Sequence, residues 1–242
     1  MEFKRIEHTV EDTAEGRLYR LTGRDLVLWP VTTTLGVLDK PALDAFRASI
    51  GKEAADAKRE DAREVGTEVH KQIRRLCSGK PIGTYEWSQL GFPTAADNRV
   101  RNCLRAYKRF KNETGYRPLA AELFVFSEWM QFAGTLDNIG WIRHDGKKLL
   151  DHDELALVDF KTPDHLYWPT WLQLGAYAGG VEEQYGLLPQ SIWRVRLDRE
   201  TGLPEYDCKR GECAIRQALD RYVKAQALWV YAQENGGLYG GG

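Results

Sequence analysis

The segment Leu155-Ala-Leu-Val-Asp-Phe-Lys-Thr162 constrains the fold of this chain most strongly. Its apolar first half predicts a strand over residues 155–162 that lies deep in a β-sheet. Residues two apart on a strand share a face, so Asp159 and Lys161 point the same way at its end. Such partly desolvated charges must pair with each other or hold an ion or a ligand. The tripeptide alone does not decide between a structural ion pair and a functional site, because Asp/Glu-x-Lys recurs elsewhere in the chain.

Composition and charge exclude several classes of protein. The 242 residues are 43% hydrophobic and 29% charged, as in a folded globular chain. No stretch approaches the roughly 20 consecutive apolar residues that span a bilayer, and the first residues lack the apolar core of a secretory signal. We therefore expect a cytoplasmic protein with no membrane partner. Because 34 basic residues balance 35 acidic ones, any nucleic-acid contact must come from local patches.

The hydrophobic period changes along the chain from helical to extended and back. No repeat or Pro/Gly/Ser-rich linker interrupts it, so we expect one domain over residues 1–242, with a flexible Gly-rich tail at 236–242. Weak alternation in the first thirty residues predicts short strands, and Thr32–Thr34 are expected to cap a helix that begins near Leu35. The portion over about 35–115 is otherwise helical. The remaining predicted elements are helices over 41–77 and 95–114, a loop over 81–93, strands over 119–127, 131–143, 155–162 and 191–197, a short strand around Tyr206, and helices over 170–185 and 212–234. This order predicts an α/β fold with a central mixed β-sheet flanked by helices.

A second carboxylate lies on the predicted strand before Asp159. Asp137 ends the segment Phe132-Ala-Gly-Thr-Leu-Asp137. If the two strands pair antiparallel around the turn at Asp145-Gly146, Asp137 and Asp159 converge at one end of the sheet. Two adjacent carboxylates repel unless a proton or a cation lies between them, and oxygen ligands suit Mg²⁺ or Mn²⁺. The alternative is that Asp137 only shapes a bend of the backbone.

His70 lies on the predicted helix over 41–77. The buried stripe of that helix is formed by Val65, Val69, Ile73 and Leu76. The His70 side chain leans back over Gly66, where the missing side chain leaves room for an imidazole and a bound group. The alternative is an ordinary surface or core histidine.

The helix that follows Asp159 carries two polar side chains on one face. Gln173 and Tyr177 are four residues apart, so they are neighbours on the helix surface. An ordinary amphipathic helix explains this spacing as well as a functional site does.

Together and in this order, these segments resemble the RecB-like branch of the PD-(D/E)XK nuclease superfamily, in particular its stand-alone phage-type and organellar members. The resemblance implies a restriction-endonuclease-like core. It rests on Val31-Thr-Thr-Thr-Leu35, Leu38-Asp-Lys-Pro41, Gly66-Thr-Glu-Val-His70, Glu122, Gly134-Thr-Leu-Asp137, Asp159-Phe-Lys161 and Gln173-x-x-x-Tyr177.

The resemblance also implies roles for these residues. His70, Asp137 and Asp159 are expected to hold Mg²⁺ or Mn²⁺, together with the backbone carbonyl of Phe160. Lys161 is expected to orient or activate the attacking water and to stabilise charge on the phosphate. Gln173 and Tyr177 are expected to support the site and to contact DNA near the cut, and Glu122 matches a family glutamate that is a further candidate ligand.

Some members of this branch carry an iron–sulfur cluster, which is not expected here. Cys208 and Cys213 are five residues apart, Cys77 and Cys103 lie far upstream, and no Cys-x-x-Cys occurs. The sequence also lacks the Gly-x-x-x-x-Gly-Lys-Ser/Thr signature of a helicase, so the resemblance is to a stand-alone nuclease module.

Three groups of residues are candidates for DNA contact. The helix over 95–114 carries a basic stripe, Arg194 and Arg196 share one face of the strand over 191–197, and Trp168 and Trp171 are candidates to stack on unpaired bases. A solvated helix face and core tryptophans are the alternatives. The basic stripe consists of Arg101, Arg105, Lys108 and Arg109.

The sequence therefore predicts a metal-dependent deoxyribonuclease, more specifically an exonuclease that trims linear DNA ends in recombination, repair or replication. The alternatives are a structure-specific endonuclease, a catalytically inactive nuclease fold that binds nucleic acid, and a metal hydrolase acting on another phosphoester. By analogy, the phage-type entry motif indicates a viral or mobile-element role in recombination. A virus-encoded protein that acts in the host cytoplasm, together with a recombination or replication protein, is one form of this expectation.

Overall fold

The computed structural model describes residues 3, 6–13, 16–38, 51–79 and 94–235. The predicted loop over 81–93, the predicted helical residues 41–50 and the predicted tail at 236–242 lie outside these described residues.

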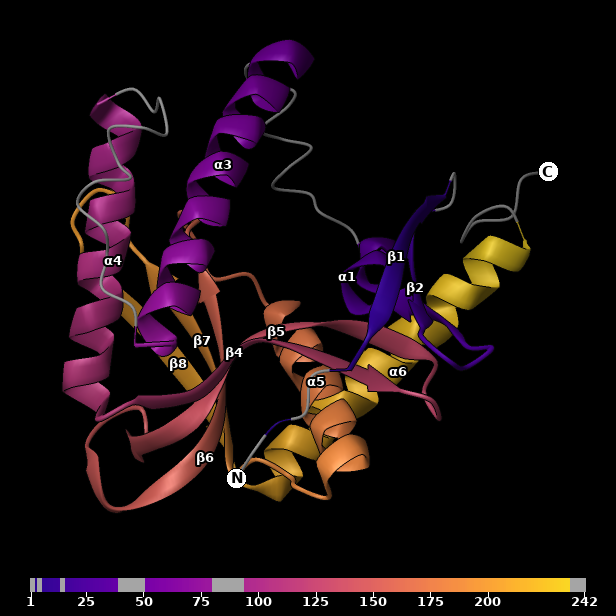
Figure 1. Cartoon of the computed structure of the whole chain (residues 1–242). Coiled ribbons are helices and arrows are strands. Elements are labelled where there is room, and N and C mark those ends of the chain that lie inside the picture. Colours follow the sequence, from indigo (N-terminus) through magenta and orange to yellow (C-terminus); the bar gives the residue numbers. More distant parts are fainter. Residues whose placement is uncertain (1–2, 4–5, 14–15, 39–50, 80–93, 236–242) are drawn as a thin grey trace.

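A mixed β-sheet forms the centre of the protein, as the sequence predicts (Figure 1). Strands follow the order β1-β2-β3-β5-β6-β7-β8, and β4 pairs with β5. The pairs β3–β5 and β6–β7 are parallel, and the other pairs are antiparallel. The strands are β1 (His8–Thr13), β2 (Gly16–Leu21), β3 (Val27–Pro30), β4 (Arg117–Ser127), β5 (Phe132–His144), β6 (Leu149–Lys161), β7 (Ser191–Leu197) and β8 (Pro204–Arg210).

The sheet forks along β5. One edge of β5 pairs with β4 along most of its length, whereas its other edge is shared by two strands. Phe132 and Ala133 pair with β3, and pairing with β6 begins at Asn138. Within the described residues, the edge from Gly134 to Asp137 therefore pairs with neither β3 nor β6, which leaves Asp137 at the branch point.

Long helices cover both faces of the sheet (Figure 1). Alternate residues of β6 enter two separate cores: Leu155 and Leu157 pack with helices α5 and α6, whereas Val158 and Phe160 pack with α3 and α4. The helices are α3 (Lys52–Cys77), α4 (Thr94–Thr114), α5 (Thr170–Tyr185) and α6 (Glu212–Glu234), together with the short α1 (Val31–Thr34) and the 3₁₀ helix η1 (Leu35–Val37). This arrangement confirms the predicted fold class.

Two packing contacts position the helices that carry site residues. The predicted apolar stripe holds α3 in place, and a close contact with α6 holds α5 in place. Val65, Val69 and Ile73 of α3 are fully buried against α4 and the sheet. At Gly175 of α5, an added Cβ would lie 2.5 Å from the carbonyl carbon of Ala218, so glycine lets the backbone of α6 approach closely.

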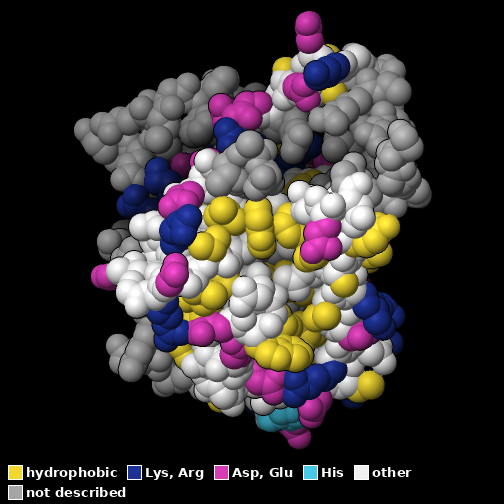
Figure 2. Space-filling view, turned by 90° about the vertical axis from the view of Figure 1, so that its right-hand side faces the viewer, with side chains coloured by type: hydrophobic (Ala, Val, Ile, Leu, Met, Phe, Trp, Pro, Cys, Tyr) yellow, Lys and Arg dark blue, Asp and Glu magenta, His cyan; other side chains and the backbone are white. Residues whose placement is uncertain are grey.

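Helix α6 is less well covered toward its C-terminus. Its exposed large apolar residues are Val223, Leu228, Val230 and Tyr231. Figure 2 shows apolar side chains gathered on this side of the molecule.

Two details of the predicted elements differ from the structure. A helix does begin at Leu35, the 3₁₀ helix η1, but Thr34 makes no side-chain cap hydrogen bond there, because the threonines belong to α1, which begins directly after Pro30. Proline fixes the φ angle at the helix start, and the Thr34 hydroxyl donates to the Val31 carbonyl inside the helix (2.9 Å). Strand β6 begins at Leu149 instead of Leu155, because its polar first half pairs with β5 in an exposed hairpin.

Candidate metal centre

Three side chains from different elements meet beside the fork. His70 of α3, Glu122 of β4 and Asp137 of β5 each offer one ligand atom, and these atoms lie within 4.8 Å of one another. His70 Nδ1 is 3.5 Å from Asp137 Oδ1 and 3.8 Å from Glu122 Oε1. All three residues are half-buried, so the group is partly accessible to solvent.

A strained backbone places Glu122 in this group. Its φ angle is +54°, in the left-handed region that non-glycine residues rarely adopt within a strand. Ala121 pairs with Asn138 and Leu123 with Leu136, so Glu122 lies beside Asp137. Backbone strain of this kind costs about 1–3 kcal/mol and concentrates at functional sites. The sequence resemblance names Glu122 as a candidate, but no local pattern foretells the strain.

Asp137 is fixed by the neighbouring strand. Its Oδ2 accepts a hydrogen bond from the backbone N–H of Phe160 (2.8 Å), while its Oδ1 faces His70. The adjacent Asn138 is almost fully buried, and its Oδ1 accepts hydrogen bonds from Cys77 (3.3 Å) and Tyr116 (3.4 Å). Sequence reasoning missed Asn138, because an isolated asparagine within a strand carries no distinguishing pattern. The role predicted for the Phe160 carbonyl stays a prediction.

Asp159 and Lys161 do point the same way and form an ion pair. Lys161 Nζ donates to Asp159 Oδ1 (2.9 Å) and lies 2.8 Å from Oδ2. The Asp159 side chain is only 1% exposed. Its Oδ2 is buried and receives no hydrogen bond of acceptable geometry. Asp159 is not part of the three-residue group, so the predicted set of His70, Asp137 and Asp159 differs from the cluster that the structure brings together.

The electrostatics show that this corner of the protein carries excess negative charge. Burial raises the pKa of Asp159 to about 6, because the Lys161 ammonium offsets the lost hydration only in part and Asp137 raises the pKa further. Burial and then Asp137 also raise the pKa of Glu122, against the opposing effect of His70. Burial lowers the pKa of Lys161, but Asp159 and Asp137 outweigh it and leave that pKa raised.

The residues fit a divalent metal ion. One imidazole and several carboxylate oxygens are side-chain donors that bind such ions in proteins. His70, Glu122 and Asp137 supply the donors, and Asp159 Oδ2, which is buried and lies 2.8 Å from Lys161 Nζ, is a further acceptor close enough to interact electrostatically with His70 and Asp137. Burial is the main cause of the raised pKa values of Glu122 and Asp159, and a cation would offset the repulsion from Asp137 that raises them further.

Gly66 has a different role from the one its sequence position suggests. An added Cβ at Gly66 would lie 3.3 Å from Thr162 Oγ1, and no contact of this Cβ with His70 is found. Glycine therefore lets α3 approach the end of β6, which brings His70 toward the carboxylates, and does not make room for the imidazole.

Gln173 and Tyr177 lie on α5, which packs on the opposite face of the sheet from α3, the helix that carries His70. Tyr177 is buried, and its ring and hydroxyl lie over Gly134, where a Cβ would be only 2.6 Å from Oη. Gln173 Nε2 is 3.5 Å from the same hydroxyl. Burial raises the pKa of Tyr177 well above its usual value, so the phenol stays protonated. These two side chains support β5 next to the site.

The candidate DNA-contacting residues differ in exposure and in whether they already form ion pairs within the protein. Arg101, Arg105, Lys108 and Arg109 are exposed on α4, although Arg109 pairs with Glu113 (3.4 Å). Their role as a phosphate-contacting stripe stays a prediction.

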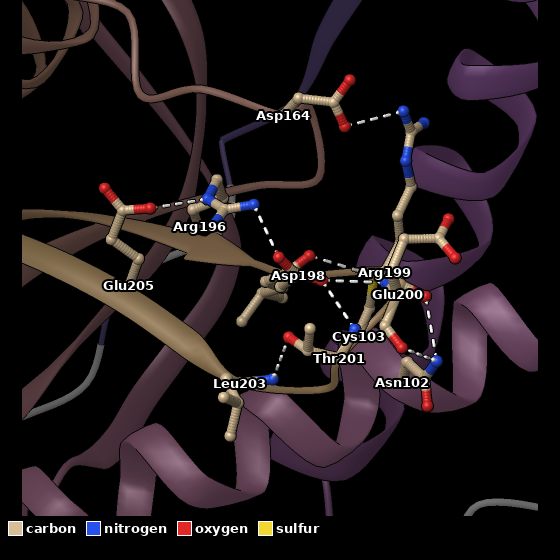
Figure 3. A network of polar contacts seen from close by, with 11 residues as sticks. Asn102, Cys103, Asp164, Arg196, Asp198, Arg199, Glu200, Thr201, Leu203 and Glu205 are labelled. Atoms are coloured by element: carbon tan, nitrogen blue, oxygen red, sulfur yellow. Dashed lines mark hydrogen bonds and ion pairs between the residues drawn. The ribbon is translucent and has the colours of Figure 1, made fainter.

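The two arginines of β7 are already engaged within the protein. Arg194 pairs with Asp207 (3.1 Å), and Arg196 pairs with Asp198 (2.9 Å) and Glu205 (2.8 Å; Figure 3). Both arginine side chains are less than one-fifth exposed. A phosphate would have to compete with these carboxylates.

The two candidate stacking tryptophans also differ in exposure. Trp168 is 55% exposed, whereas Trp171 is buried in the core. Of the two candidates for stacking on a base, only Trp168 has a ring that a ligand can reach.

Comparison with known proteins gives only a distant structural similarity. No protein-family model and no curated protein sequence matches the chain. Among solved structures, a protein from Eubacterium rectale described as a "putative exonuclease" is similar, with a TM-score of 0.45 and 13% identity. The match covers 72% of this chain and 68% of the other. Among the described residues, no helix is both long and apolar enough to cross a bilayer.

Proposed function

We propose that this chain is a divalent-metal-dependent nuclease that hydrolyses phosphodiester bonds in DNA. The observation that carries the proposal is the combination of a three-donor group with an ion pair between buried Asp159 and half-buried Lys161 on the adjoining strand. A site with one ammonium group beside several carboxylates suits a reaction at an anionic phosphate that also needs a cation.

Each residue of the site has a separate role in the proposed reaction. His70, Glu122 and Asp137 hold Mg²⁺ or Mn²⁺, with Asp159 and the Phe160 carbonyl as further candidate ligands. The bound ion would lower the pKa of a water molecule and offset charge on the phosphate oxygens. Lys161 orients the attacking water and stabilises charge on the phosphate. Asp159 holds the Lys161 ammonium in place, and Tyr177 with Gln173 supports β5 behind them.

The sequence resemblance favours an exonuclease that degrades DNA from its ends. Such an enzyme would act on linear DNA during recombination, repair or replication. The test compares end-labelled single-stranded and double-stranded linear DNA with closed circles, in Mg²⁺ and in Mn²⁺. Degradation of linear DNA alone supports an exonuclease, cutting of circles supports an endonuclease, and tight binding without cleavage in either metal would contradict nuclease activity.

The Lys161 role has its own test. Lys161→Ala is expected to abolish cleavage, whereas Lys147→Ala leaves it intact, because Lys147 belongs to a copy of the same tripeptide at an exposed turn. Lys161→Ala leaves a buried unpaired carboxylate, which destabilises the fold. The double variant Asp159→Leu/Lys161→Met removes both charges and leaves no unpaired carboxylate, so its loss of activity in a folded protein would assign the loss to the Asp159–Lys161 pair and not to unfolding. Full activity in Lys161→Ala would remove Lys161 from the mechanism.

A further inference from the structure

The segment between β6 and α5, residues 162–169, connects two parts of the candidate site. It begins directly after Lys161 and leads into the helix that carries Gln173 and Tyr177. This aromatic loop exposes two neighbouring rings, with Tyr167 52% and Trp168 55% exposed. Large aromatic side chains at such exposure lose apolar burial, so their position calls for an explanation.

Polar contacts hold the aromatic loop in place. Arg194 Nη1 donates to the carbonyls of Leu166 (3.3 Å) and Tyr167 (3.4 Å). The backbone N–H of Trp171 donates to the Trp168 carbonyl (3.0 Å). On the other side of the loop, Arg199 pairs with Asp164 (2.9 Å; Figure 3). The Arg194 and Trp171 contacts hold the backbone next to the two rings, whereas the exposed Arg199–Asp164 pair adds little, so the loop can receive a ligand with little further loss of backbone entropy.

The nearby cations face inward. The Arg194 guanidinium lies 4.6 Å and Lys209 Nζ 5.1 Å from the ring centre of buried Trp171. Arg194 is also paired with Asp207. Arg194 is therefore engaged within the protein, and the feature that the aromatic loop itself offers to a ligand is its two exposed rings.

We propose that Tyr167 and Trp168 stack on unpaired bases of the DNA strand that enters the site, so that the substrate is single-stranded DNA or a frayed end. This inference rests on the proposed nuclease function. Trp168 follows Lys161 by seven positions, so even an extended chain keeps them within about 25 Å, a few nucleotides of a single strand. Stacking on aromatic rings tolerates every base and requires that the base be unpaired. Arg194 is then a positioning residue for the loop and not a phosphate contact.

The experiment measures binding without cleavage. Fluorescence anisotropy compares a labelled oligothymidylate with a blunt duplex of the same length, with Ca²⁺ replacing Mg²⁺. The full-length protein is expected to prefer the single strand. Trp168→Ala should weaken single-strand binding about tenfold and leave duplex binding unchanged, because one stacked base contributes on the order of a tenfold change in affinity. Trp168→Phe should retain most of the preference.

A matched control comes from another exposed tryptophan. Trp129 is 83% exposed at the β4–β5 turn, so Trp129→Ala removes the same side chain from a different place and should not change binding. Arg194→Met should reduce the single-strand preference, while Arg194→Lys, which keeps a donor for the loop carbonyls, should restore much of it. A merely structural loss would weaken both DNA forms equally.

The outcomes separate this inference from the proposed function. Cleavage in Mn²⁺ by the unaltered protein tests the nuclease itself. If cleavage occurs but Trp168→Ala binds single strands as well as before, or loses both DNA forms equally, the stacking proposal is overturned. If no cleavage occurs but the selective loss is seen, the stacking site stands and the nuclease proposal fails.

Discussion

The backbone N–H of Phe160 donates a hydrogen bond to Oδ2 of Asp137 across the fork in the sheet, at 2.8 Å. Asp137 therefore uses one carboxylate oxygen to join β5 to β6 and leaves the other, Oδ1, facing His70 at 3.5 Å. The same side chain stabilises the fork and supplies a donor to the candidate metal centre.

These two roles can be separated with Asp137→Asn. The asparagine carbonyl oxygen can still accept the Phe160 hydrogen bond, but its amide nitrogen cannot hold a cation. We expect the melting temperature without metal to change little and cleavage to fall at least about a hundredfold. Calorimetric titration with Mn²⁺ should show weakened binding. Retained Mn²⁺ affinity would show that Asp137 is not a ligand.

The strain at Glu122 predicts a gain in stability when it is relieved. Glycine adopts a φ of +54° without cost, whereas alanine keeps the strain, so Glu122→Gly should be about 1 kcal/mol more stable than Glu122→Ala. Urea unfolding in the presence of a chelator measures this difference. Both variants should lose the stabilisation that added Mn²⁺ gives the unaltered protein, because both lack the carboxylate. Equal stability of the two variants would contradict the strain.

The packing of Tyr177 over Gly134 predicts a coupled pair. An added Cβ would lie 2.6 Å from Tyr177 Oη and 2.8 Å from Cε1, so Gly134→Ala should destabilise the fold by about 1–3 kcal/mol. Adding Tyr177→Phe removes the nearest atom and should recover part of that loss in a double-mutant cycle. Gly36→Ala is the control, since a Cβ there meets nothing within 4 Å. Additive effects would show that the two residues do not compete for space.

Asp198 gives a pH dependence of stability that is separate from the site. Burial alone would raise its pKa, but hydrogen bonds from the backbone N–H groups of Thr201 and Glu200, and from Arg196, lower it to about 2 (Figure 3). Because the folded pKa lies below the ordinary value of 3.8, this stabilisation is present above about pH 4 and is lost as the pH falls toward 2.

Asp198→Asn should therefore reduce the free energy of unfolding by about 2 kcal/mol at pH 7, and the difference from the unaltered protein should shrink toward zero near pH 2. Denaturant unfolding over this pH range measures it. Asp164→Asn serves as comparison, because Asp164 is 70% exposed and an exposed ion pair contributes little. If the difference in the free energy of unfolding between Asp198→Asn and the unaltered protein did not change with pH, the ionisation of Asp198 would not be its cause.

Much of this architecture follows from local patterns. Helices α5 and α6 and strand β7 begin and end where the hydrophobic period and the stop signals indicate, since the periods of 3.6 and 2 are set by backbone geometry. The shared face of Asp159 and Lys161 follows from strand geometry in the same way, and the structure adds the ion pair between them.

The sequence by itself determined the order of elements and the chemical character of Asp137, Asp159, Lys161 and His70, because these depend on neighbours in the chain. Only the tertiary structure decided that Glu122, bent into the left-handed region, joins His70 and Asp137, and that Arg194 holds the aromatic loop. These relationships join strands and helices far apart in the chain, and no local periodicity records which distant side chain will satisfy a charge or a carbonyl.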